Sequence, residues 1–206
     1  MLEHTETNDP SRVTEQVTGV ILAGGKSSRM GRDKATLEVE GVALFERVLG
    51  VFQRIFSDIL IAGERPDLAR PGVCCHPDIY PGSALGGLYT GLFEADSDWI
   101  FVAPCDLPFP DPNLIKALLR LRDGYDVVLP RTGQGLDPLF ACYRKSCLEP
   151  MRRLLDNRRY RIFDFYDQVR VRYVDEHELP EGWRQALLNV NTPEEFQDLE
   201  DLLPKP

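Results

Sequence analysis

The chain has 206 residues, of which 43% are hydrophobic and 28% are charged, and its formal net charge is −9. These are the values of an ordinary globular protein that is large enough for one domain with a full core. The acidic balance argues against nonspecific nucleic-acid binding, which needs a basic surface, and no apolar run approaches the roughly 20 residues of a membrane helix.

The N-terminal stretch MLEHTETNDPSR is polar and lacks the basic start, apolar middle and cleavage site of a signal peptide. We therefore expect residues 1–15 to be a flexible tail and residues 16–206 to form a single domain. The five cysteines form no CxxC pair and do not alternate with histidine, so we expect reduced cysteines and no zinc site. These features together predict a cytoplasmic protein.

Apolar runs alternate with helical periodicities along the chain. Thr18–Ala23 is short, apolar and followed by two glycines, as in a buried parallel strand. The predicted strands are Thr18–Ala23, Asp58–Ala62, Val73–Cys75, Trp99–Ala103, Asp126–Leu129, Leu139–Tyr143 and Val169–Val174, and the predicted helices are Ala43–Phe56, Leu85–Glu94, Asn113–Leu121 and Cys147–Leu155. No pattern is assigned to Arg158–Asp167, whereas Thr192, Pro193 and Glu195 predict a further helix start.

This alternation predicts an α/β fold, a Rossmann-like three-layer α/β/α sandwich with a mostly parallel sheet. Ligands of such sheets bind at the carboxyl ends of the strands. Two segments end strands with unusual chemistry, the glycine-rich basic loop Gly24–Lys34 and the proline-rich loop Pro104–Pro112, which contains Asp106. We expect both loops to face one crevice.

The first of these loops, in the stretch ILAGGKSSRMGRDK, is not a Walker loop. A Walker loop needs a glycine five residues before the glycine of its Gly-Lys-Ser tail, and Val20 stands at that position. The loop can still bind an anion, because Gly24 and Gly25 let backbone amides approach a ligand closely. Arg29 offers a planar fork for phosphate oxygens and Lys34 a mobile charge. Residues 26–34 carry four basic side chains and one acid in an otherwise acidic chain.

The stretch LAGGKSSRMGRDK resembles the signature loop of nucleotidyltransferases related to the sugar-phosphate nucleotidylyltransferases, and is most similar to that of the molybdenum cofactor guanylyltransferases. Further resemblances cover almost all of the chain beyond the tail, in YPGSALGGLYTGL, FVAPCDLPF, LDPLFACYR and NVNTPEEF. The chain also departs from the family, whose mid-chain motif often reads His-Pro-Leu, because Asp137 here precedes Pro138 and Leu139.

The resemblance implies a fold of the nucleotide-diphospho-sugar transferase type and a Mg²⁺-dependent transfer of GMP from GTP to the molybdenum-molybdopterin cofactor, with release of pyrophosphate. Cofactor-synthesis proteins and molybdoenzyme maturation proteins are implied partners. The implied GTP-binding residues are Leu22, Ala23, Gly24, Lys34, Asp78 and Asp106, with Asp106 as the metal ligand and Asn189 and Asn191 near the bound substrate. Lys34, Arg29 and Asp106 suit the neutralisation of charge that phosphoryl transfer requires.

Three other functions fit the same features: a cytidylyltransferase acting on the same cofactor, a sugar-phosphate nucleotidylyltransferase, and a nucleotide-binding regulator without enzymatic activity. Lys34 and Asp106 together disfavour the regulator. A structural interpretation of Asp106 is a loop-capping aspartate in a proline-rich turn. The pairs Arg152-Arg153 and Arg158-Arg159 could attract an anionic pterin cofactor, although a solvated helix face is the preferred interpretation.

Overall fold

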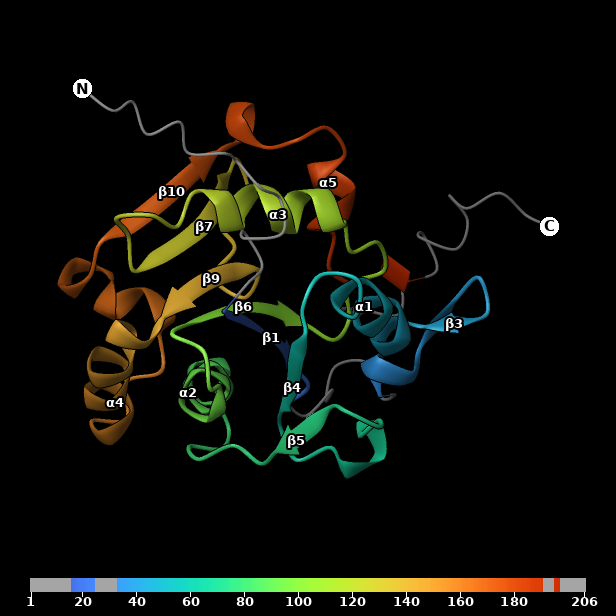
Figure 1. The fold of residues 1–206 in the computed structure, drawn as a ribbon, viewed down its shortest axis with the longest axis horizontal. Coiled ribbons are helices and arrows are strands. Elements are labelled where there is room, and N and C mark those ends of the chain that lie inside the picture. Colours follow the sequence, from blue (N-terminus) through green and yellow to red (C-terminus); the bar gives the residue numbers. More distant parts are fainter. Residues whose placement is uncertain (1–15, 25–32, 191–194, 197–206) are drawn as a thin grey trace, which may run out of the picture.

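A mixed β-sheet forms the centre of the computed structural model (Figure 1), which describes residues 16–24, 33–190 and 195–196. Within these ranges the sheet has eight strands in the order β10-β7-β9-β6-β1-β4-β5, with β8 paired to β7. Their bounds are β1 Val17–Leu22, β4 Asp58–Ala62, β5 Cys74–His76, β6 Trp99–Pro104, β7 Val127–Thr132, β8 Gly135–Leu136, β9 Ala141–Arg144 and β10 Val171–Asp175.

Strand direction determines which loops can meet. β1 pairs in parallel with both β4 and β6, and β4 pairs in parallel with β5, so the carboxyl ends of these four strands share one edge of the sheet. β9 is antiparallel to β6 and to β7, so it begins at the edge where β6 ends. The loops after β1, β5 and β6 and the turn before β9 therefore all lie along the carboxyl edge.

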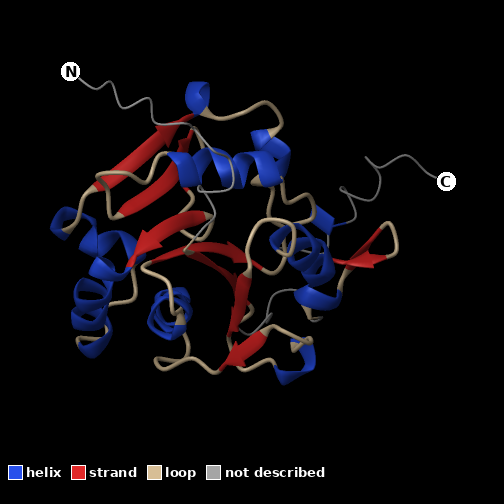
Figure 2. Ribbon diagram, viewed as in Figure 1, coloured by secondary structure: helices blue, strands red, loops and turns tan. Residues whose placement is uncertain are grey.

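Helices cover both faces of the sheet (Figure 2). Their bounds are α1 Leu44–Phe52, α2 Ala84–Glu94, α3 Pro112–Arg120, α4 Leu148–Asp156 and α5 Trp183–Ala186. The side chains of β1 alternate between two cores: Ile21 packs in the core that contains residues of α1 and α3, and Val20 in the core that contains residues of α2 and α4. Because both faces are covered, all six residues of β1 are buried. The predicted three-layer α/β/α sandwich is confirmed.

Local signals explain where the helices near the carboxyl edge begin. Ser83 caps α2 by accepting a hydrogen bond from the Gly86 amide at 3.0 Å. Asp111 caps α3 in the same way, accepting from the Asn113 amide at 2.8 Å, and Pro112 occupies the first turn. Gly86 permits a close crossing, since a Cβ there would lie 1.8 Å from the carbonyl oxygen of Tyr80. Caps and small residues thus position the loop between β5 and α2 against the sheet.

The predicted elements differ from the structure mainly in short pieces. The helix predicted over Ala43–Phe56 ends at Phe52, and the hairpin of β2 (Glu38–Val39) and β3 (Val42–Ala43) was not predicted. Five 3₁₀ helices in the described ranges were also not predicted: η1 Lys34–Thr36, η2 Pro66–Leu68, η3 Lys145–Cys147, η4 Ile162–Gln168 and η5 Glu176–Glu178. The predicted tail and the helix start at Thr192 and Pro193 lie outside the described residues. No helix in the described ranges is long and apolar enough to cross a membrane.

Candidate active site

A cleft of about 630 Å³ lies at the carboxyl edge of the sheet. It brings together seven of the residues that the sequence singled out, namely Leu22, Ala23, Gly24, Lys34, Asp78, Asp106 and Asn189. The other lining residues include Asp33, Arg65, Ser83, Gly87, Cys105 and Leu139. Arg29 and Asn191, which were also singled out, lie outside the described residues. The described ends of the loop Gly24–Lys34, the loop after β6 and the segment around Asp78 therefore face one cleft.

Asp106 is held at the end of the central strand β6. Pro104 is the last residue of that strand and pairs with Leu22 of β1. The Cys105 amide then donates a hydrogen bond to the carbonyl oxygen of Leu22 at 3.0 Å, which extends the pairing to the residue before Asp106. The backbone that carries this carboxylate is thus an extension of the sheet, so the side chain has a defined position in the cleft.

Lys34 and Asp106 form an ion pair inside the cleft. Lys34 Nζ lies 3.1 Å from Asp106 Oδ2, and the two side chains are only 18% and 16% exposed. At that separation the attraction is about 5 kcal/mol for an effective dielectric constant of about 20, before the cost of desolvating both groups is subtracted. The pair joins residues that are 72 positions apart in the chain. It places one positive and one negative charge where a phosphate group and a metal ion could bind.

Arg65 anchors the segment that carries Lys34. Its guanidinium donates to both carboxylate oxygens of Asp33, at 3.1 and 2.6 Å, and also to Asp67. The hydrogen bond with Asp67 is the main cause that raises the pKa of Arg65 above its ordinary value. Asp33 in turn accepts from the Ala35 amide at 3.2 Å and so caps the short helix η1, which begins at Lys34. Arg65 was not among the residues predicted for the site, because nothing in the local sequence indicates a partner 32 residues away.

Asp78 lies between two glycines that line the cleft. A Cβ at Gly24 would be 2.9 Å from Asp78 Oδ2, and a Cβ at Gly87 would be 3.5 Å from Asp78 Oδ1. Oδ1 is buried and has no hydrogen-bond partner among the described residues, and burial raises the pKa of this carboxyl group. A buried acceptor without a donor is costly in a folded protein, so this oxygen is a candidate contact for a ligand that supplies the donor.

The end of β1 forms the floor between these two acidic side chains. The Ala23 amide donates to the carbonyl oxygen of Ala62 at 2.9 Å, so the pairing with β4 continues past Leu22. Leu22 and Ala23 are buried, whereas Gly24 is exposed. A nucleoside could therefore lie against apolar side chains and the bare backbone of Gly24.

Asp106 is the carboxylate expected to hold a metal ion, and it shares the cleft with Asp33 and Asp78. The described part of the chain contains no group of three or more His, Cys, Asp or Glu side chains that could hold a metal ion. A single carboxylate nevertheless fits Mg²⁺, because this ion commonly takes one or two carboxylates together with substrate phosphates and waters. The donor set of the cleft suits a metal that arrives with a triphosphate.

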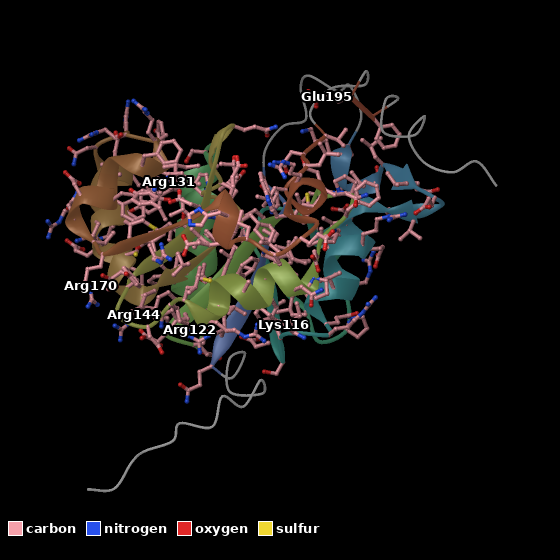
Figure 3. The ribbon with its side chains drawn as sticks, turned by 90° about the horizontal axis from the view of Figure 1, so that it is seen from above. Lys116, Arg122, Arg131, Arg144, Arg170 and Glu195 are labelled. Atoms are coloured by element: carbon pink, nitrogen blue, oxygen red, sulfur yellow. The ribbon has the colours of Figure 1, made fainter. Side chains whose placement is uncertain are left out.

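Several arginines outside the cleft have structural partners. Arg152 and Arg153 of α4 both contact Glu149, and Arg159 contacts Asp164, which supports the interpretation of these residues as a solvated surface. Figure 3 shows Arg144 and Arg170 at the edge of the molecule away from Glu195. Arg144 pairs with Asp98 and Arg170 with Asp126, two acids at the amino edge of the sheet. None of these arginines lines the cleft, to which Lys34 and Arg65 contribute their side chains.

A mostly parallel sheet with a glycine-bordered cleft and a lysine–carboxylate pair at its carboxyl edge defines an α/β protein whose ligand site lies at the carboxyl ends of the strands. The comparisons with known proteins identify the family. The chain belongs to the family of the MobA-like NTP transferase domain, whose model matches residues 19–171.

Similar proteins cover nearly the whole chain. A Pelotomaculum thermopropionicum protein named "Probable molybdenum cofactor guanylyltransferase" is 42% identical over 186 residues, covering 88% of this chain and 90% of the relative. A Carboxydothermus hydrogenoformans protein of the same name is 33% identical and covers 90% of this chain and 95% of the relative. The crystal structure of molybdopterin-guanine dinucleotide biosynthesis protein A from Archaeoglobus fulgidus has a TM-score of 0.78 at 22% identity, covering 90% of this chain and 97% of that one, and shows a shared fold.

Proposed function

We propose that this protein transfers GMP from GTP to the molybdenum-molybdopterin cofactor, forming the guanine dinucleotide form of the cofactor and pyrophosphate. The observation that carries the proposal is the ion pair between Lys34 and Asp106 in a cleft that also contains the unsatisfied carboxylate of Asp78. The names of the relatives favour GTP over CTP as the nucleotide, and the molybdenum cofactor over a sugar phosphate as the acceptor.

In this proposal the nucleoside binds at the end of β1. Leu22 and Ala23 contact its apolar faces, and the backbone of Gly24 approaches it without an intervening side chain. Asp78 accepts a hydrogen bond from an N–H or O–H group of the nucleoside, which supplies the partner that Oδ1 lacks in the free protein. Arg29 and Asn191 remain expected contacts of phosphate and substrate, respectively.

Lys34 and Asp106 act on the phosphates. Asp106 would hold Mg²⁺, which supplies charge neutralisation on the phosphate oxygens when it is bound. The ammonium of Lys34 is then shared between Asp106 and the triphosphate, and it offsets the negative charge that grows on the departing pyrophosphate. The terminal phosphate of the acceptor is already a nucleophile once it is oriented, so the proposed reaction needs no histidine base. Consistent with this, His76 contacts Glu94 at 3.2 Å and does not line the cleft.

The test is pyrophosphate release from GTP, CTP or ATP with the molybdenum-molybdopterin cofactor and Mg²⁺. We expect release from GTP only, because polar groups matched to one base reject another strongly. Equal turnover with CTP would overturn the guanine assignment, and a sugar phosphate that replaces the cofactor as acceptor would overturn the choice of acceptor.

Asp106→Asn tests the metal assignment, with Asp111→Asn as its matched control. Both substitutions remove one carboxylate from the loop after β6, but Asp111 only caps α3, and asparagine is also a good N-cap. Asp106→Asn should leave the circular dichroism spectrum unchanged and lower metal-dependent turnover by several powers of ten, roughly the loss of a preorganised charge contact and the metal together. A folded Asp106→Asn protein with turnover close to that of Asp111→Asn would refute the assignment.

A further inference from the structure

A second cavity, of about 190 Å³, adjoins the main cleft. Pro104, Leu139 and Asn189 line both spaces, so the two are neighbours across a shared wall. The rest of the small cavity is lined by Leu107, Asp137, Pro138, Phe140 and Leu187. Of these eight described residues Asp137 is the only ionisable one. The small cavity is therefore an apolar space with a single acidic group in its wall.

Asp137 and Asp78 lie on opposite sides of Asp106. Asp137 belongs to the turn between β8 and β9, and Ala141 at the start of β9 pairs with Val102 near the carboxyl end of β6. In the sheet order, β9 flanks β6 on one side, whereas β1, β4 and β5 lie on the other. Because Asp78 follows β5, the two acidic groups lie on opposite sides of β6, the strand that Asp106 follows. A reaction centred on Asp106 would have the nucleotide on one side and the acceptor on the other.

The turn that carries Asp137 is held firmly. The Asp137 amide donates to the carbonyl oxygen of Pro130 at 3.2 Å, and the Phe140 amide donates to the carbonyl oxygen of Asp137 at 3.1 Å. The hydroxyl of Tyr143 donates to the carbonyl oxygen of Pro138 at 2.7 Å. These bonds are to the backbone of the turn, so they position Asp137 without using its carboxylate.

The carboxylate of Asp137 has no hydrogen bond or ion pair with the described residues, and burial alone raises its pKa to about 6. A half-buried carboxylate without a donor is stabilised by a ligand with N–H groups. A carboxylate accepts two parallel N–H bonds in a bidentate pair, which gives geometric selectivity as well as affinity. The side chains of Leu107, Phe140 and Leu187 give the cavity an apolar lining, against which a ring can lie while its polar edge faces Asp137.

We propose that Asp137 binds the edge of the acceptor's heterocycle at which a ring N–H and an exocyclic amino group lie side by side, so that this chain selects a 2-amino-4-oxo pterin. The inference rests on the proposed function, because that function supplies a pterin-containing acceptor. It gives a role to the residue at which this chain departs from the His-Pro-Leu pattern. The guanine of GTP carries a similar edge and could also donate to a carboxylate. In the proposed complex, however, the nucleoside lies in the main cleft beside Asp78 and Gly24, whereas Asp137 lines the small cavity.

The test compares binding of free pterin and lumazine, which has oxygen in place of the 2-amino group, to the full-length protein by fluorescence titration. The wild type should bind pterin on the order of 10- to 100-fold more tightly than lumazine, the range of a hydrogen bond to a charged group. Asp137→Asn should abolish this preference, raise the KM for the molybdenum-molybdopterin cofactor more than it lowers kcat, and leave the Kd for GTP unchanged. Asp123→Asn is the matched control, because it removes an exposed carboxylate from the turn before β7, at the other edge of the sheet.

The outcomes separate this inference from the proposed function. A wild type without pterin preference, or an Asp137→Asn protein that keeps it, would overturn the role of Asp137 even if GTP-dependent transfer occurs. A higher Kd for GTP in Asp137→Asn, with pterin binding unchanged, would show that the residue contacts guanine and would overturn the acceptor contact. Pterin selectivity that depends on Asp137 in a protein without transferase activity would support the contact and refute the proposed function.

Discussion

Asp78→Asn should stabilise the free protein and weaken its binding of GTP. The buried Oδ1 of Asp78 has no donor among the described residues, and burial raises the pKa of the group, so the ionised side chain is held at a cost. Asparagine keeps the shape and removes the charge. It also replaces one of the two carboxylate oxygens by an amino group, so the nucleoside loses a charged acceptor for the hydrogen bond that it donates in the proposed complex.

The two effects have different sizes. Relief of a buried, unpaired charge is worth about 1 kcal/mol, the low end of the range for an unsatisfied buried group, because the amide that replaces the carboxylate still lacks a partner; this corresponds to a rise in Tm of roughly 2–4 °C for a chain of this length. Loss of a hydrogen bond to a charged group should raise the Kd for GTP on the order of 10- to 100-fold. Thermal unfolding without nucleotide measures the first effect, and calorimetric titration with GTP measures the second.

The sign of the binding change makes this experiment decisive. Removing a negative charge from the cleft should by itself favour an anionic triphosphate, so weaker binding can arise only from a lost contact. Asp123→Asn removes the same charge far from the cleft and controls for the change in net charge. If Asp78→Asn lowers the Tm and binds GTP as well as Asp123→Asn does, then Asp78 is a structural turn residue and the argument from its unsatisfied oxygen is wrong.

Three further predictions follow from the same geometry. Lys34→Ala should lower the kcat for pyrophosphate release by on the order of 10²-fold and raise the Kd for GTP much less, because its charge matters most as pyrophosphate departs; equal losses in both would assign Lys34 to ground-state binding. Gly24→Ala brings a Cβ within 2.9 Å of Asp78 Oδ2, so the carboxylate must move, and calorimetry should show GTP binding weakened by roughly 10-fold, whereas an unchanged Kd would show that this approach is unimportant. Burial raises the pKa of Asp137 from its ordinary value of 3.8 to about 6, so the folded state binds this proton more tightly than the unfolded state and loses stability as the pH rises through that window. Asp137→Asn should therefore increase the free energy of unfolding in urea by about 1–2 kcal/mol at pH 7.5, after a discount for solvent screening, and by little at pH 4; an equal effect at both pH values would contradict this.

The central strands could be predicted from the sequence because their local composition is apolar, as in strands that are buried. Asp58–Ala62 was predicted with the bounds that the structure has, and Trp99–Ala103 differs from β6 by one residue. Both runs are apolar on consecutive positions, as strands covered on both faces must be. The position of Asp106 just after the second run was equally visible, since a charged residue after a buried strand has to emerge at its end.

Short strands and their pairing partners could not be predicted from the sequence. The hairpin of β2 and β3 has two residues in each strand, and β8 also has two, so neither leaves a periodic pattern. The turn Asp137–Phe140 was predicted in part as strand, because Leu139 and Phe140 are apolar. In the structure these residues precede β9, whose reversed direction depends on pairing with β6 and β7.

The cleft likewise combines features that the sequence predicts with features that only the structure shows. The amino-acid sequence by itself determined that a glycine-rich basic loop and Asp106 would each end a buried strand, because these features depend on neighbours in the chain. Only the tertiary structure decided that Lys34 lies 3.1 Å from Asp106, that Arg65 holds the cap of η1, and that the carboxylates of Asp78 and Asp137 lack donors among the described residues. These relations depend on strand order and on the packing of segments far apart in the chain. The free energy of that packing cannot be read from any local sequence pattern.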